Sequence, residues 1–152
     1  MKRPSAIEML IEMRRRERDR VAGICAQAQR DVDAATGTLR MLTQYRSDYE
    51  NRAPKNGQSA TDTLRVQVHE RFVDKLGLAI GEQDNLVGNL NERSEQQQRA
   101  LSDRQRRLKA METLALRRET ERLKRLESLE QKQTDEFATQ AYARARREGN
   151  KP

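Results

Sequence analysis

One short segment decides the fold of this 152-residue chain: Arg52-Ala53-Pro54-Lys55-Asn56-Gly57-Gln58-Ser59. It holds the only proline between Ser5 and Lys151, followed by an Asn-Gly pair, and both features favour a turn over a helix. On either side, residues 5–52 and 60–147 contain no proline, so nothing in these stretches forces a break. We therefore predict two long helices joined by a turn at about residues 53–60.

The first predicted helix covers about residues 5–52 and begins with a capping box. Ser5 and Glu8 form the S-x-x-E pattern, in which each side chain accepts a hydrogen bond from the main-chain N–H of the other residue. Apolar residues follow at spacings of three and four, which is typical of a narrow coiled-coil stripe. The predicted stripe is Ile7, Leu10, Val21, Ile24, Ala28, Val32, Ala35, Leu39, Leu42, Tyr45 and Tyr49.

The second predicted helix covers about residues 61–147, with Ser59 or Thr61 as its N-cap. Its middle, residues 91–99, is almost entirely polar. The predicted stripe is Val68, Phe72, Leu76, Ala79 or Ile80, Gln83, Val87, Leu90, Gln97, Leu101, Leu108, Met111 and Ala115. It then moves over by one residue, as happens in a straight helix over many turns, and continues through Leu116, Leu123, Leu126, Glu130, Gln133 and Phe137.

Two helices joined by a short turn run antiparallel, so the predicted fold is all-α: a long antiparallel two-helix coiled-coil hairpin in one domain, residues 1–152. With the pivot near Gly57, the first helix ends opposite about Leu108. Roughly the last 40 residues then form a C-terminal helix overhang with no partner in the chain. Such a helix either frays or packs against another protein, and we favour the second.

The composition agrees with a thin core. Apolar residues make up 34% of the chain, and Leu, Ile, Val and Phe together number only 27 of 152, which borders on the composition of disordered chains. Ala, Glu, Lys, Leu and Arg make up about half, which is typical of long exposed helices when the apolar residues keep a helical period. The spacing of three and four residues found in both stripes favours long helices over a disordered chain.

The same composition argues against catalysis. His69 and Cys25 are the only histidine and cysteine, so neither a metal site nor a nucleophile-base pair has enough members, and we expect no enzyme activity and no cofactor. A lone cysteine fits a reducing compartment. No apolar stretch is long enough to cross a membrane or serve as a signal peptide, so we expect a soluble cytoplasmic protein.

Charge is distributed unevenly along the chain. The net charge of +7 divides into +3 for residues 1–53, −1 for residues 54–100 and +5 for residues 101–152. The hairpin's open end and overhang are therefore basic, and such arginine clusters bind acidic protein surfaces or phosphates. The simpler interpretation is a solvated face balanced by pairs along the helix, such as Glu121 with Arg125.

Aromatic residues gather near the turn. The expected pairing places Leu42 opposite Phe72, with Tyr45 and Tyr49 at the same end and His69 beside Tyr45. Seam packing accounts for part of this cluster. However, two helices cannot cover all of these rings, so we expect an exposed aromatic patch that binds a partner.

Four pieces of the sequence, in this order and spacing, resemble the FliJ family, the small coiled-coil proteins of the flagellar type III export apparatus. They are residues 42–49 (LTQYRSDY), the group of Phe72, Leu76, Ala79-Ile80 and Gln83, residues 107–114 (RLKAMETL) and residues 131–138 (QKQTDEFA). The most specific pieces are the Tyr-x-x-x-Tyr before the turn and the Asp-Glu-Phe-Ala near the C-terminus. The resemblance extends over nearly the whole chain.

The resemblance implies a noncatalytic stalk, similar in shape to the central subunit of rotary ATPases, at the flagellar base on the cytoplasmic face of the inner membrane. It implies three partners: the hexameric export ATPase FliI, the export gate protein FlhA and the export chaperones. Carried over by position, the export-gate contacts are Leu42, Tyr45, Tyr49, Phe72, Leu76, Ala79 and Gln83. The ATPase-ring contacts are assigned to Arg14, Arg15, Arg18, Arg117, Arg118, Arg122, Arg125 and Phe137.

The main alternative is a basic coiled coil that serves as a scaffold or binds nucleic acid through counterion release. Two features argue against nucleic acid: no aromatic stacking platform lies among the arginines, and 24 acidic residues are interspersed with them. A membrane-surface helix needs a bulky apolar face that the basic stretches lack, so we expect no direct membrane insertion.

Overall fold

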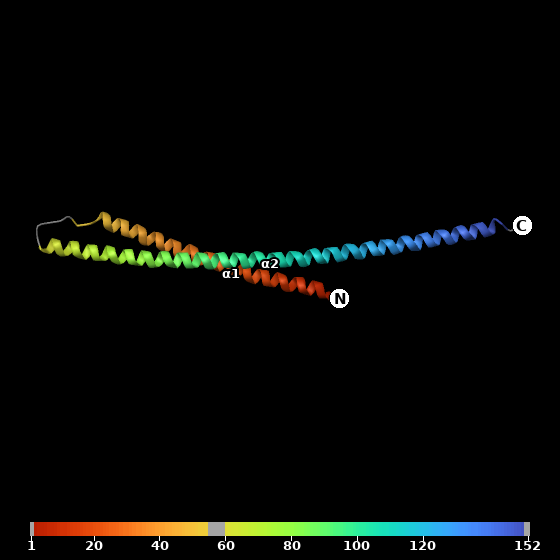
Figure 1. Ribbon diagram of the computed structural model, residues 1–152, viewed down its shortest axis with the longest axis horizontal. Helices are drawn as coiled ribbons and strands as arrows, with labels where there is room; N and C mark the ends of the chain where they lie inside the picture. The colour runs from red at the N-terminus through yellow and green to blue at the C-terminus, as the bar shows by residue number, and fades with distance from the viewer. Residues whose placement is uncertain (1, 55–59, 151–152) are drawn as a thin grey trace. The chain divides into compact units, whose positions relative to one another are not determined.

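A computed structural model describes residues 2–54 and 60–150 of the chain. These residues form two helices, α1 (Ala6–Asn51) and α2 (Ala60–Glu148), and contain no strand (Figure 1). The predicted all-α helical hairpin is confirmed. The predicted turn residues Asn56 and Gly57 and the possible cap Ser59 lie outside the described residues.

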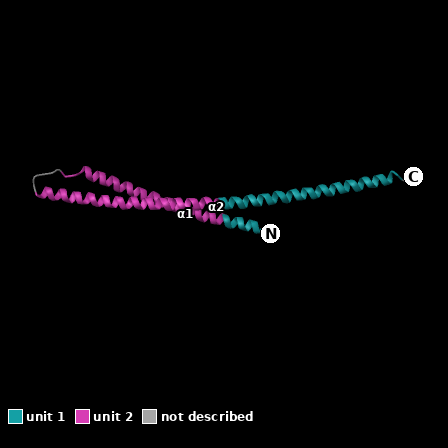
Figure 2. Cartoon of the chain, viewed as in Figure 1, with its two compact units in different colours: residues 1–14, 106–152 teal, residues 15–105 magenta. Residues whose placement is uncertain are grey.

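The chain divides into two compact units (Figure 2). The first, called the hairpin unit here, is Arg15–Gln105 and contains most of α1 and the first half of α2. The second, called the terminal unit, combines Met1–Arg14 with Arg106–Pro152. The two units share α2, which is one continuous helix.

The ends of α1 follow from its sequence. The Ser5 N–H donates to Glu8 Oε2 at 2.9 Å, and the Glu8 N–H donates to Ser5 Oγ at 3.3 Å, which confirms the predicted capping box. At the other end, the N–H groups of Arg52 and Ala53 donate three residues back, to the carbonyls of Tyr49 and Glu50. This tightened last turn ends the helix ahead of Pro54, which disfavours helical backbone in the residue before it.

The seam of the hairpin unit follows a strict heptad pattern. On α1 one series of buried and half-buried residues has steps of three and four: Arg18, Val21, Cys25, Ala28, Val32, Ala35, Leu39, Leu42, Arg46 and Tyr49. Further half-buried residues lie beside it: Glu17, Ala22, Asp31, Thr36 and Gly37. On α2 the same pattern gives Val66, His69, Val73, Leu76, Ile80, Gln83, Val87, Leu90, Ser94, Gln97, Leu101 and Arg104. A repeat of 3.5 residues is the signature of a coiled coil.

Within the hairpin unit three positions of the predicted stripes were wrong, and in the terminal unit the predicted stripe residue Leu10 is also exposed. Ile24, Tyr45 and Val68 are exposed. Cys25, Arg46 and His69, each one residue further along, are half-buried at the seam in their place. The prediction selected the apolar residue of each adjacent pair, whereas the phase of the coiled coil is set by the whole heptad series and forces the neighbour inward.

The buried core is small. Among described residues, apolar side chains are buried only at Val21, Ala28, Val32, Ala35, Leu76 and Leu108. The accessible surface is 13100 Å², whereas a compact monomer of this mass would expose about 7,900 Å². Most of these residues are Ala or Val, and the core is thin, as the low apolar content predicted.

Three polar contacts fix the register of the hairpin unit. Gln83 Nε2 donates to the carbonyl of Ala35 at 3.0 Å, and the hydroxyl of the buried Ser94 lies 3.4 Å from Gln29 Oε1. Arg104 Nη2 lies 3.5 Å from Glu17 Oε1. The two residue numbers of each pair add to about 120, so the predicted pairing, centred on Gly57, was wrong by several residues.

The register differs from the prediction because of where the two helices end. α1 stops at Asn51, while α2 starts at Ala60 and runs two turns before it reaches the level of α1. His69, for example, stacks on Tyr49 in the last turn of α1. The pivot therefore falls at the start of α2, and the estimate from the sequence had placed it at Gly57.

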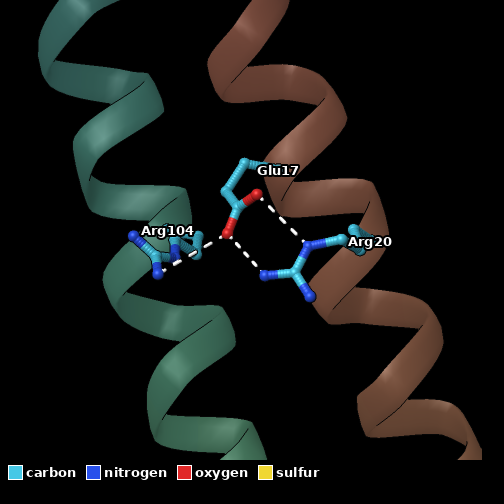
Figure 3. A network of polar contacts seen from close by, with 3 residues as sticks. All are labelled: Glu17, Arg20 and Arg104. Atoms are coloured by element: carbon cyan, nitrogen blue, oxygen red, sulfur yellow. Dashed lines mark hydrogen bonds and ion pairs between the residues drawn. The ribbon is translucent and has the colours of Figure 1, made fainter.

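Figure 3 shows the contact between Glu17 and Arg104. Glu17 on α1 binds Arg20 in the same helix, with its carboxylate 2.8 Å from Arg20 Nη2, and faces Arg104 on α2. The hydrogen bond with Glu17 raises the pKa of Arg20 above its ordinary value. Glu17 thus links two arginines, and one of these links joins the two helices.

Candidate functional site

The first candidate surface is a group of four rings near the turn, called the turn-end cluster: Tyr45, Tyr49, His69 and Phe72. Tyr49 is at its centre, with its ring stacked on His69 at 4.5 Å and tilted against Phe72 at 4.6 Å. Tyr45 contacts the edge of Phe72 at 6.3 Å and Tyr49 at 6.4 Å. These separations and tilts are those preferred by aromatic pairs.

The predicted gate contacts differ in accessibility. Tyr45 is 53% exposed, whereas Leu42, Tyr49, Phe72 and Ala79 are half-buried. Two members lie deeper in the seam: Leu76 is only 8% exposed, and Gln83 is half-buried with its amide bound to α1. Tyr45 is therefore the ring of the cluster that is most accessible to a partner.

A shallow hollow opens beside the cluster, where α1 ends. It has a volume of about 420 Å³ and is lined by Tyr49, Arg52, Pro54, Leu64, Arg65, Val68 and His69. Leu64 and Val68 are more than half exposed. The sequence prediction missed Leu64 as an exposed apolar residue, because Leu64 lies four residues before Val68 and so falls in line with the predicted stripe; the phase of the coiled coil in the structure leaves both exposed.

The second candidate surface is the C-terminal part of α2. Every residue from Leu116 to Glu148 is exposed, and this segment is called the overhang here. Its exposed apolar residues include Leu116 at 68% and Phe137 at 76%; the others are Leu123, Leu126, Leu129 and Tyr142. An apolar stripe without a partner in its own chain is an interaction surface.

The predicted ring-contact arginines fall into two groups. Arg117, Arg118, Arg122 and Arg125 are all exposed on the overhang. Near the N-terminus, Arg15 is exposed, but Arg14 and Arg18 are half-buried on the seam side of α1, where Arg18 Nη2 pairs with Asp19 at 2.8 Å. The overhang arginines are thus more exposed than Arg14 and Arg18 near the N-terminus.

Arg122 is held by a neighbour. Its guanidinium donates two hydrogen bonds to the Glu119 carboxylate, at 2.7 and 3.1 Å. These bonds lower the pKa of Glu119 and raise that of Arg122 relative to their ordinary values. Both side chains are more than half exposed, so an incoming acidic surface competes for Arg122 with Glu119 and with water.

Chemically, these surfaces are suited to binding. Within residues 2–54 and 60–150, no cluster of three or more His, Cys, Asp and Glu side chains could hold a metal ion. In the same residues, neither helix has a segment long and apolar enough to cross a membrane. Cys25 is half-buried at the seam, and the ring of His69 packs against Tyr49.

Two comparisons with known proteins bear on identity. The sequence matches the family model described as the flagellar FliJ protein over residues 2–147. A curated relative, the flagellar FliJ protein of Escherichia coli strain K12, is 24% identical over 139 residues, which cover 91% of this chain and 95% of that protein.

Proposed function

Because the chain belongs to the FliJ family and is a component of the flagellar export apparatus, we propose that it acts there as a noncatalytic stalk and adaptor. It binds and stimulates the hexameric export ATPase FliI. It also connects this ATPase to the export gate protein FlhA and to the export chaperones. It works in the cytoplasm, at the flagellar base beside the inner membrane.

The observation that carries this proposal is the overhang. Its arginines and Phe137 are exposed on a helix that has no partner from Leu116 onward. Arginine binds carboxylates through a planar fork, and an exposed apolar stripe supplies the contact area that charge alone lacks. A ring of ATPase subunits with acidic loops is a suitable partner for such a helix, because the helix needs no deep docking pocket.

The turn-end cluster supports the second half of the proposal. Exposed aromatic residues are over-represented among the residues that dominate binding energy at protein interfaces. We assign the gate contact to Leu42, Tyr45, Tyr49, Phe72, Leu76, Ala79 and Gln83. Within this set Tyr45 is the most exposed aromatic residue, while Leu76 is buried in the seam and Gln83 binds the Ala35 carbonyl across it.

ATP hydrolysis by the purified export ATPase, measured with and without this chain, tests the proposed stimulation. We expect stimulation by the unmodified chain, and its loss when Arg117, Arg118, Arg122 and Arg125 are all changed to Glu. The matched control changes Arg144, Arg146 and Arg147 to Glu, which are also exposed on the overhang. Stimulation that survives the first set of changes would rule out the proposed electrostatic contact.

Binding to the cytoplasmic part of the gate protein tests the proposed contact between the turn-end cluster and the export gate. We expect Tyr45→Ala combined with Phe72→Ala to weaken binding at least tenfold, because an aromatic anchor contributes about 2 kcal/mol or more. Tyr142→Ala is the control, since this ring is even more exposed, at 71%, but lies on the overhang. Far-ultraviolet circular dichroism must remain unchanged; loss of helix would instead show that the two rings act as seam core.

A further inference from the structure

The overhang carries a charge pattern of two segments, and the proposed function uses the arginines of only one of them. Residues 116–126 carry five basic and two acidic side chains, a net charge of +3. Residues 127–138 carry four acidic side chains and one basic side chain, a net charge of −3. Two adjacent segments of one exposed helix are therefore opposite in charge and nearly equal in length.

An apolar stripe runs across both segments. Four exposed apolar residues lie along one side of the helix, because the steps between them are sums of three- and four-residue steps. They are Leu116, Leu123, Leu126 and Phe137. From Leu116 to Phe137 the helix rises about 32 Å. This stripe is displaced by one residue from the half-buried series that ends at Ala115, so it lies on a different side of the helix.

We propose that two copies of this chain pair through their overhangs in antiparallel orientation, about a twofold axis close to Leu126. An antiparallel pair sets the basic segment of each copy against the acidic segment of the other and joins the two apolar stripes. A parallel pair would set like charges against each other along the whole segment, which is unfavourable. The charge pattern thus selects both the partner, a second copy, and its direction.

The pairing is weak and depends on salt. Glu119 and Glu130 interrupt the apolar stripe, so the contact resembles a transient interface more than a permanent one. Its exposed ion pairs are screened as ionic strength rises. The pairing would also cover the arginines assigned to the ATPase ring, so a pool of paired chains would compete with ring binding.

Sedimentation of the full chain over a range of concentrations, without the ATPase, tests the pairing. We expect reversible dimers at low salt that dissociate as salt is added. In one variant Glu127, Glu130, Asp135 and Glu136 become Lys; in the other Arg117, Arg118, Arg122 and Arg125 become Glu. Each alone should stay monomeric, whereas their equimolar mixture should form dimers about tenfold tighter than the unmodified chain.

Changing Arg144, Arg146 and Arg147 to Glu is the control, because these residues lie outside the paired segment and should leave the dimer unaffected. Circular dichroism must show that each variant keeps its helix. The pairing is wrong if both the unmodified chain and the mixture remain monomeric. Because no ATPase is present, this result is independent of the proposed stimulation of hydrolysis.

Cross-linking tests the direction. In a Cys25→Ser background, Thr120→Cys and Thr134→Cys each place one exposed thiol beside the stripe without altering it. In an antiparallel pair the thiol at position 120 faces the region of position 134 in the other copy. The mixture should therefore form a disulfide-linked dimer, and each variant alone should not. Cross-linking of the Thr120→Cys variant with itself would instead show a parallel pair.

Discussion

Gln83 shows how a single polar residue contributes to this fold. It lies at a seam position of α2, where a coiled coil ordinarily places an apolar side chain, and its amide donates to the Ala35 carbonyl on α1. A polar side chain at such a position costs some stability but fixes the register, because a shifted helix would leave the amide without its acceptor.

We expect Gln83→Ala to lower the free energy of unfolding by about 1 kcal/mol, since it removes one half-buried hydrogen bond and some seam packing. Urea titration followed by circular dichroism measures this change. Gln98→Ala is the matched control, because Gln98 is exposed on the same helix and should shift stability by less than about 0.5 kcal/mol. Equal effects from the two substitutions would remove the role assigned to Gln83.

At the scale of the element, α2 combines two kinds of helix. Its first part alternates buried and exposed positions in heptads, while from Leu116 onward no residue is even half-buried. Isolated helices are marginal in water, so the overhang draws on strong helix formers such as Leu, Arg, Glu and Lys and on local pairs such as Glu119 with Arg122.

A chain that ends at Ala115 should therefore keep the stability of the seam. We expect its free energy of unfolding to match that of the full chain within about 0.5 kcal/mol, because none of the residues from Leu116 to Glu148 is buried or half-buried. The near-ultraviolet signal of the turn-end cluster reports this transition, and dilute protein avoids any pairing of overhangs. A large loss of stability would mean that the overhang supports the hairpin.

At the scale of the whole molecule, only a few buried side chains contribute to stability. The six apolar side chains that are buried among the described residues number far fewer than in a compact domain of this length, and the accessible surface is correspondingly large. Little surface is therefore newly exposed on unfolding. The chain uses most of its length as surface and only a narrow seam as core.

This thin core predicts a shallow dependence of stability on urea. We expect a slope near 1 kcal/mol per molar urea, at the lower end of the range for small proteins, because the slope scales with the surface exposed on unfolding. Equilibrium urea unfolding of the full chain gives this slope directly. A slope near 3 kcal/mol per molar would show that the chain buries much more surface in solution.

The sequence predicted the secondary structure and the existence of both candidate surfaces. Proline placement located the break, the Ser5 and Glu8 pattern located the start of α1, and the unequal lengths of the two predicted helices indicated the overhang. These features depend on local backbone chemistry, which short sequence patterns report well. The choice between Tyr45 and Arg46 at the seam could not be made locally, because it depends on the phase of the whole heptad series.

The sequence by itself thus determined that this protein is a two-helix hairpin with a basic, unpartnered C-terminal helix. Only the tertiary structure decided which residues of each helix face each other, and so it placed Gln83 against Ala35, Arg104 against Glu17 and Tyr49 against His69. The physical reason is that register depends on where both helices end and on contacts between residues far apart in the chain. Neither of these is encoded in the periodicity of one helix.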